Sequence, residues 1–174
     1  MGHEEHLKYA SKEVKRAVNF AVLTVSDTRT KDTDESGKIL CEILKSNEYN
    51  VVYYEIVKDD ENEIRNFINK AISDENVDAV ITNGGTGISK RDVTIETVKV
   101  FFEKTLDGFG EIFRYLSYAE IGSRAIMSRA TAGVCKGKVI ISIPGSPNAV
   151  KLAMNKIIIP EISHIIWEIK RQIK

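Results

Sequence analysis

Short apolar runs alternate along the chain with longer segments in which apolar residues recur every three or four positions. The short runs are rich in β-branched residues and each of them predicts a strand; they cover residues 18–25, 51–57, 78–82 and 138–143. The segments with helical spacing predict amphipathic helices that begin near residues 36, 64, 94 and 112, with further helices up to the C-terminus. Strands that alternate with helices favour a three-layer α/β/α fold with a mostly parallel sheet.

The chain of 174 residues suits one α/β domain with a substantial core. Residues 1–16 are polar and predict an N-terminal extension, and residues 17–174, without repeats or a low-complexity linker, predict a single domain. In the last helices we expect a break near Pro160. After Pro160, isoleucines at helical spacing form an apolar stripe. We expect most of the stripe to pack in the core and part of it to form a subunit interface. The stripe consists of Ile162, Ile165, Ile166, Ile169 and Ile173.

Composition narrows the function classes. Lysine plus arginine and aspartate plus glutamate both number 25, and this zero net charge argues against broad nucleic-acid binding. No apolar run is long enough to span a membrane, and no signal peptide is visible, so we expect a cytoplasmic protein. Cys41 and Cys135 form no CxxC motif and are expected to be reduced thiols.

Four polar loops follow the predicted strands and begin at Ser26, Asp59, Gly84 and Gly145. Ligands of parallel sheets bind outside the carboxyl ends of the strands, so these loops are the candidate binding site. The third loop, residues 82–87, reads Thr-Asn-Gly-Gly-Thr-Gly and is followed by a helical pattern. Glycine permits positive φ and close approach of a ligand, and helix N-termini attract anions.

The glycine turn does not match the common phosphate-binding motifs. Lys90 follows Ser89 where a Walker A loop requires glycine, Arg91 replaces its Ser or Thr, and the third glycine of a dinucleotide fingerprint is missing. By itself the turn is equally consistent with phosphate binding and with a structural role. Phosphate binding gains weight from a second turn, in which Ser146 is expected to cap a helix that starts at Pro147. Two helix N-termini that face one crevice would hold two phosphate groups.

Asp59 and Asp92 both fall just beyond predicted strands. Carboxylates beside phosphates repel them unless a cation lies between, so this arrangement implies Mg²⁺. The alternative is that both aspartates cap helices, which is a common role for Asp. We also expect Thr94 to cap the helix after the glycine turn, and Gly108 and Gly110 to interrupt the helical pattern. With no Ser-His-Asp or Cys-His arrangement in view, phosphoryl or nucleotidyl transfer through positioning and metal electrostatics fits best.

Taken together, these motifs resemble the signature of the molybdopterin-binding (MogA/MoaB) family. The resemblance covers the chain from about Phe20 onward and depends on the order and spacing of five segments, which are residues 25–29, 57–60, 82–94, 128–133 and 144–149. It implies a three-layer α/β fold, assembly into trimers or hexamers, and binding of molybdopterin. In catalytic members it implies Mg-ATP as well, and adenylylation of molybdopterin with release of diphosphate before metal insertion.

Carried over residue by residue, Asp92 matches the catalytic aspartate and Asp59 the second functional aspartate, and the resemblance implies that both hold Mg²⁺ directly or through water. Lys58 stands where the family often has proline, which makes this loop less rigid. The substrate- and nucleotide-binding positions implied by the resemblance are Ser26, Asp27, Thr28, Thr82, Gly84, Gly85, Thr86, Gly87, Arg91, Ser128, Arg129, Pro144, Gly145 and Ser146.

Other readings remain open from the sequence. The first alternative is a protein of the same fold that binds molybdopterin without transferase activity, against which the presence of Asp59 and Asp92 argues. A scaffold for protein partners and a nucleotide-pyrophosphatase relative are less favoured, because no additional domain is visible and the turn after the third strand differs. The sequence does not distinguish molybdenum from tungsten as the eventual metal.

Overall fold

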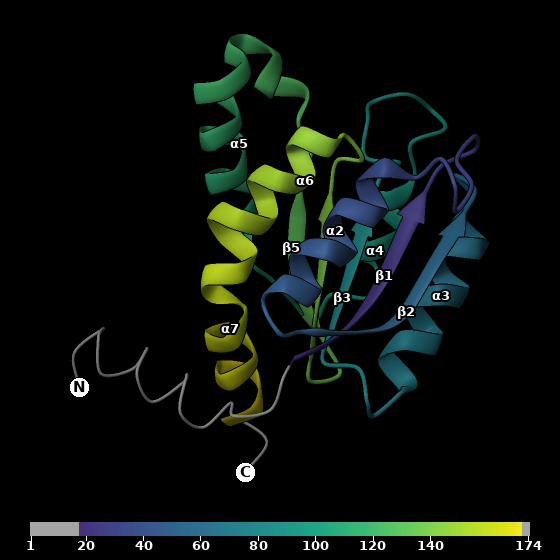
Figure 1. Cartoon of the computed structure of the whole chain (residues 1–174), viewed down its shortest axis with the longest axis vertical. Coiled ribbons are helices and arrows are strands. Elements are labelled where there is room, and N and C mark those ends of the chain that lie inside the picture. The colour runs from purple at the N-terminus through teal and green to yellow at the C-terminus, as the bar shows by residue number, and fades with distance from the viewer. Residues whose placement is uncertain (1–17, 172–174) are drawn as a thin grey trace, which may run out of the picture.

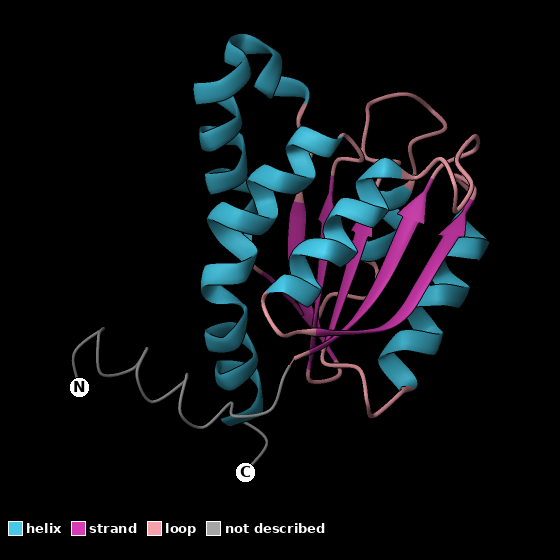
Figure 2. Cartoon of the chain, viewed as in Figure 1, coloured by secondary structure: helices cyan, strands magenta, loops and turns pink. Residues whose placement is uncertain are grey.

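The computed structural model describes residues 18–171, so the predicted N-terminal extension and Ile173 lie outside the described residues. A six-stranded sheet lies between two layers of helices (Figures 1 and 2), which confirms the predicted α/β fold. The strands are β1 (Asn19–Val25), β2 (Asn50–Val57), β3 (Ala79–Asn83), β4 (Lys104–Thr105), β5 (Thr131–Cys135) and β6 (Lys138–Ile143).

The strand order is β2-β1-β3-β6-β5-β4. The first four strands in this order run parallel, whereas β5 is antiparallel to β6, and β4 is antiparallel to β5. The carboxyl ends of β1, β2, β3 and β6 therefore meet at one edge of the sheet. Because β5 runs in the opposite direction, its amino end lies at the same edge, and this brings the segment before Thr131 beside the four predicted loops.

Helices cover both faces of the sheet (Figure 1). One face carries α2 (Glu35–Ser46), α5 (Asp107–Ile121), α6 (Pro147–Ala153) and α7 (Ile159–Arg171), and the other carries α3 (Glu61–Ser73) and α4 (Thr94–Lys99). Two short elements complete the described chain, a 3₁₀ helix η1 (Gly122–Met127) and a π-helical segment η2 (Met154–Ile158). Among the described residues, no helix has the length and apolar character needed to cross a bilayer.

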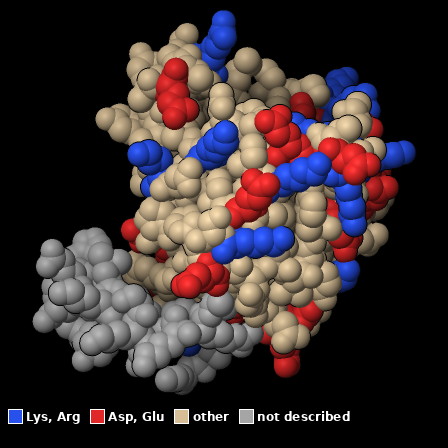
Figure 3. All heavy atoms as spheres, viewed as in Figure 1, with Lys and Arg blue, Asp and Glu red and all other residues tan. Residues whose placement is uncertain are grey.

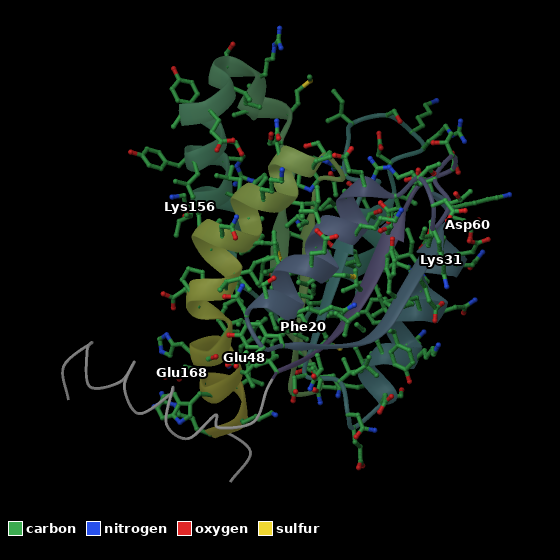
Figure 4. All side chains as sticks on the ribbon, in the orientation of Figure 1. Phe20, Lys31, Glu48, Asp60, Lys156 and Glu168 are labelled. Carbon is green, nitrogen blue, oxygen red and sulfur yellow. The ribbon has the colours of Figure 1, made fainter. Side chains whose placement is uncertain are left out.

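The alternation of side chains along β1 explains why the sheet needs helices on both faces. Phe20 (labelled in Figure 4) and Val22 belong to the core beneath α2, whereas Ala21 and Leu23 belong to the core beneath α3. Successive side chains of a strand point to opposite faces, so a strand that is apolar throughout must be covered twice. All seven residues of β1 are buried, as this arrangement requires.

Two strands were not predicted, and two expected interruptions are wrong. The short strands β4 and β5 have no counterpart among the predicted strands. Gly108 and Gly110 lie inside α5 instead of breaking it. A Cβ at Gly110 would come within 2.6 Å of the Ala130 carbonyl oxygen, so this glycine lets the helix approach the segment that leads into β5.

The expected break near Pro160 is wrong. The chain stays helical from α6 through η2 into α7, with Pro160 as the second residue of α7. Proline lacks an N–H and clashes with the preceding turn, and the wider π-helical segment directly before α7 accommodates this. On α7 itself, Ile162 and Ile166 are buried, and Ile165 and Ile169 pack partly against the same core.

Candidate functional site

A cleft of about 490 Å³ opens at the carboxyl edge of the sheet. It brings together eleven of the residues predicted from the sequence, drawn from all four loops and from the segment before β5. These are Ser26, Thr28, Asp59, Gly84, Gly85, Thr86, Gly87, Asp92, Ser128, Pro144 and Gly145. Asp60 in Figure 4 marks the β2 side of this edge. The parallel strand order therefore assembles the predicted loops into a single site.

The glycine turn has the conformation expected of an anion-binding loop. Gly84 and Gly85 have φ of 98° and 60°, and a Cβ at Gly84 would clash with the Val25 carbonyl oxygen. The N–H of Gly84 donates to the Ile143 carbonyl at 3.1 Å, which ties the turn to the end of β6. The N–H groups of Gly85 and Thr86 donate no hydrogen bond within residues 18–171. Successive backbone N–H groups without internal partners are suited to binding a phosphate oxygen.

Asp92 lines the cleft and does not cap a helix. Its Oδ2 accepts a hydrogen bond from the Ser89 N–H at 2.9 Å, and the residue at the N-cap of α4 is Val93. The Ser89 side-chain hydrogen bond, helped by backbone N–H groups and Arg129, holds the pKa of Asp92 below its ordinary value despite partial burial. Asp92 is therefore an anion held in place by its own loop.

Asp59 is also not a helix cap, because Asp60 caps α3. The Oδ1 atom of Asp59 and the Oγ1 atom of Thr94 are both buried, and neither has a hydrogen-bond partner among the described residues. A Cβ at Gly85 would clash with both atoms, so they flank the same point beside the turn. Desolvation first, and then the charges of Asp27 and Asp92, raise the pKa of Asp59. A carboxylate in this environment is stabilised by a cation.

The donor set fits Mg²⁺ better than a metal held by protein ligands alone. Within residues 18–171 no cluster of three or more metal-binding side chains occurs. Mg²⁺ is usually held by one or two carboxylates together with substrate phosphates and water. Asp59, whose Oδ1 has no partner among the described residues, and Asp92 provide such a pair next to the glycine turn.

The structure gives different roles to two predicted arginines. Arg91 pairs with Asp27 at the rim of the cleft, where its side chain is largely exposed. Arg129 donates to the carbonyl oxygens of Thr86 and Gly87, at 2.8 and 2.7 Å, and pairs with Glu96. Arg129 therefore fixes the glycine turn through its carbonyl oxygens. Neither Arg91 nor Arg129 lines the cleft.

Thr82 and Ser146 also lie outside the cleft lining. Thr82 is fully buried in the sheet, where its hydroxyl lies 2.5 Å from that of Ser142. Ser146 caps α6 as predicted, because its Oγ accepts from the Ala149 N–H at 3.2 Å and Pro147 is the first helical residue. Each of these residues supports the site without lining it.

Thr94 was predicted to be the N-cap of α4, and this prediction is wrong because Val93 holds that position. Thr94 is the first residue of α4, and its N–H donates to the Gly85 carbonyl at 3.0 Å. The cap bond of Ser146 likewise occupies an N–H at the start of α6. Each helix start thus uses one N–H group internally, whereas Gly85 and Thr86 line the cleft with N–H groups that have no hydrogen-bond partner among residues 18–171.

Four residues that line the cleft were not among the predicted site residues, namely Val25, Arg29, Arg124 and Met127. Arg29 stands within a segment that matches the family pattern, so its position was the available signal. Arg124 and Met127 belong to η1, which reaches the cleft through the antiparallel position of β5.

The fold and the cleft define an α/β protein with a ligand site at the carboxyl edge of its sheet. The family described as "Probable molybdopterin binding domain" matches residues 21–164. The chain is 51% identical over 173 residues to molybdenum cofactor biosynthesis protein B of Bacillus cereus, and the match covers 99% of this chain and 100% of that protein.

Solved structures agree with the sequence comparison. A crystal structure of a molybdenum cofactor biosynthesis protein B has a TM-score of 0.88 at 52% identity, covering 90% of this chain and 98% of the other. The tungsten cofactor synthesizing protein MoaB from Pyrococcus furiosus has a TM-score of 0.82 at 41% identity, covering 90% and 99%. The chain belongs to this molybdopterin-binding family of cofactor biosynthesis proteins, which confirms the resemblance seen in its motifs.

The crowding at Gly85 leads to a first prediction. Gly85→Ala places a methyl group against Thr94 and Asp59 at positive φ, so we expect a loss of about 2 kcal/mol of unfolding free energy. Gly108→Ala is the matched control, because nothing lies within 4 Å of a Cβ at that position. Thermal unfolding of both variants measures the difference, and an unaltered melting temperature for Gly85→Ala would contradict the close approach.

Proposed function

We propose that the protein adenylylates molybdopterin with Mg-ATP, giving adenylyl-molybdopterin and diphosphate, as a step in molybdenum or tungsten cofactor biosynthesis. The observation that carries this proposal is the meeting of two opposite features in one cleft. The turn at Gly85 and Thr86 offers an anion N–H groups that are unpaired within residues 18–171, and Asp59 and Asp92 offer negative charge to a cation. A bound nucleotide with its Mg²⁺ satisfies both features together.

The reaction joins an oxygen of the terminal phosphate of molybdopterin to the α-phosphorus of ATP. The bond between that phosphorus and the oxygen bridging to the β-phosphate breaks, and diphosphate leaves with the electron pair. The chain positions the two reactants, because N–H groups of the glycine turn bind phosphate oxygens and Arg129 holds the turn in shape. When bound, Mg²⁺ supplies positive charge that offsets the charge on the phosphates.

The main alternative is a protein that binds molybdopterin without transferring an adenylyl group. The Oδ1 atom of Asp59 has no hydrogen-bond partner in the described part of the chain, and this supports the catalytic proposal, since a pterin site alone does not explain it. Lys58, which replaces the proline common in the family, does not leave its loop unsupported. Its N–H donates to Glu63 Oε2 at 3.0 Å, a bond that proline could not make.

Asp92 provides the direct test of the proposal. Asp92→Ala and Asp92→Asn should lower adenylyl transfer by about 100- to 1,000-fold or more, because the charge facing the phosphates and cation is lost. The assay measures diphosphate released from ATP, Mg²⁺ and molybdopterin. Asp107→Asn, an exposed aspartate at the start of α5, is the control and should leave the rate unchanged. An active Asp92→Ala enzyme would exclude the assignment.

We further propose a homo-oligomer, a trimer or hexamer, in the reducing environment of the cytoplasm. Cys41 and Cys135 are buried free thiols, in keeping with such an environment. Exposed apolar side chains gather on α5 and η1 in a pattern that favours a subunit interface. This surface consists of Ile112, Tyr115, Tyr118, Ile121, Ile126 and Met127, which are all at least half exposed.

Disruption of this surface tests the oligomer. Tyr115→Lys should shift the protein toward smaller species, because a charge on the interface has to be desolvated on assembly. Light scattering coupled to size exclusion measures the mass. Val52→Lys on the edge strand β2 is the control, since Val52 is an exposed apolar residue away from α5. Dissociation by the Val52 variant and not by the Tyr115 variant would place the interface elsewhere.

A further inference from the structure

A buried polar network lies beneath the first loop of the cleft. At its centre is Asp34, whose side chain is fully buried. Its Oδ2 accepts hydrogen bonds from the Thr24 hydroxyl at 2.5 Å and the Tyr54 hydroxyl at 2.7 Å, and its Oδ1 accepts from Ser36 Oγ at 3.0 Å. Asn83 joins the network through Thr24 and Ser36, at 2.9 Å each. The network therefore connects three neighbouring strands and the start of α2.

The network ends at Arg29, which lines the cleft. The NH1 group of Arg29 donates to Ser36 Oγ at 2.6 Å and lies 3.6 Å from Asp34 Oδ1. Its NH2 group donates to the carbonyl oxygen of Gly145 at 2.9 Å. One guanidinium thus bridges the loop after β1 and the loop after β6, which lie 116 residues apart in the sequence.

Arg29 differs from Arg91 and Arg129 in the partner of its guanidinium group. Arg91 and Arg129 pair with the exposed carboxylates of Asp27 and Glu96 and do not line the cleft. The partner of Arg29 is instead a buried carboxylate, and 29% of the Arg29 side chain remains exposed. Within residues 18–171 the Nε–H of Arg29 donates no hydrogen bond, so it remains available to a ligand.

The charge of Asp34 explains how the guanidinium is held. Burial acts to raise the pKa of Asp34, but the hydrogen bonds from Thr24, Tyr54, Gly37 and Ser36 together hold it below the ordinary value. A buried carboxylate costs free energy unless it is fully hydrogen-bonded, as it is here. The planar guanidinium binds phosphate through paired N–H donors, and fixing it in advance reduces the entropy lost on binding.

We propose that Arg29 is the fixed cation that binds a phosphate group of the substrate, and that Asp34 is the positioning residue that holds Arg29 against Gly145. The inference rests on the proposed function only in that the cleft receives a phosphorylated ligand. It places a phosphate group of that ligand at Arg29, and it places the accompanying Mg²⁺ at Asp59 and Asp92 on the opposite side of the ligand.

A double-mutant cycle tests this coupling. Binding of Mg-ATP and of molybdopterin is measured separately by calorimetry for the wild type, Arg29→Gln, Asp34→Asn and the double variant, which shows which ligand supplies the phosphate. Arg29→Gln should weaken one of the two ligands by about 10- to 100-fold, the range for a charge-assisted hydrogen bond. Asp34→Asn should weaken the same ligand by several-fold and have no further effect once Arg29 is replaced.

Asparagine caps helices about as well as aspartate, so Asp34→Asn should keep α2 intact. If it fails to fold, Tyr54→Phe removes one hydrogen bond to Asp34 and should give a smaller loss of affinity that also vanishes in the Arg29→Gln background. Glu35→Gln, the exposed neighbour on α2, is the control and should bind normally. Arg29→Lys should recover part of the affinity.

Two results would overturn the proposal. One is unaltered affinity of Arg29→Gln for both ligands, and the other is additive losses for Arg29 and Asp34, which would make Asp34 merely structural. These binding measurements need no turnover. A protein that binds without adenylyl transfer would therefore disprove the proposed reaction and leave the role of Arg29 standing.

Discussion

The site depends on one point of backbone crowding at Gly84. Here the end of β3 lies against the carbonyl oxygen of Val25 at the end of β1, so closely that any side chain would clash. The same residue donates its N–H to Ile143 at the end of β6, and a Cβ at Gly145 would lie 3.0 Å from the Gly84 Cα. Three parallel strands therefore deliver their loops to one place, and the positive φ of Gly84 and Gly85 turns the chain into the cleft.

Charged side chains line the cleft beside the loops that meet at Gly84. Asp59 and Asp92 lie with the glycine turn, and Arg29 lies with Gly145 on the other loop. Lysine, arginine, aspartate and glutamate side chains intermingle on the face shown in Figure 3, in keeping with the zero net charge of the chain. This placement of the aspartates and of Arg29 is local to the cleft and is not a property of the whole surface.

The parts of this architecture that depend on local pattern could be predicted from the sequence. The four parallel strands are mostly apolar runs, and the rule for the carboxyl ends of parallel strands then placed Ser26, Asp59, Gly84 and Gly145 together. The strand β5 was missed because residues 131–135, Thr-Ala-Gly-Val-Cys, contain small residues and no clear alternation. Its antiparallel direction explains why Ser128 reaches the cleft, a fact that only the motif resemblance anticipated.

Roles that depend on contacts distant in sequence could not be predicted. Three arginines fall in segments that match the family pattern, and the sequence does not tell their roles apart. In the structure, Arg129 fixes the glycine turn, Arg91 pairs with Asp27 at the rim, and Arg29 lines the cleft. Threonine is a common helix cap, but the Thr94 hydroxyl lies beside Gly85 and Asp59 and has no hydrogen-bond partner among residues 18–171. Each of these roles depends on which distant loop the side chain contacts in the folded chain. The local spacing of residues does not contain that information.

The most direct test of the account is a crystal structure of the protein with ATP and Mg²⁺. We expect phosphate oxygens against the N–H groups of Gly85 and Thr86, with the cation on the side of Asp59 and Asp92. A nucleotide bound outside the cleft, or within it but away from the glycine turn and both aspartates, would contradict the account.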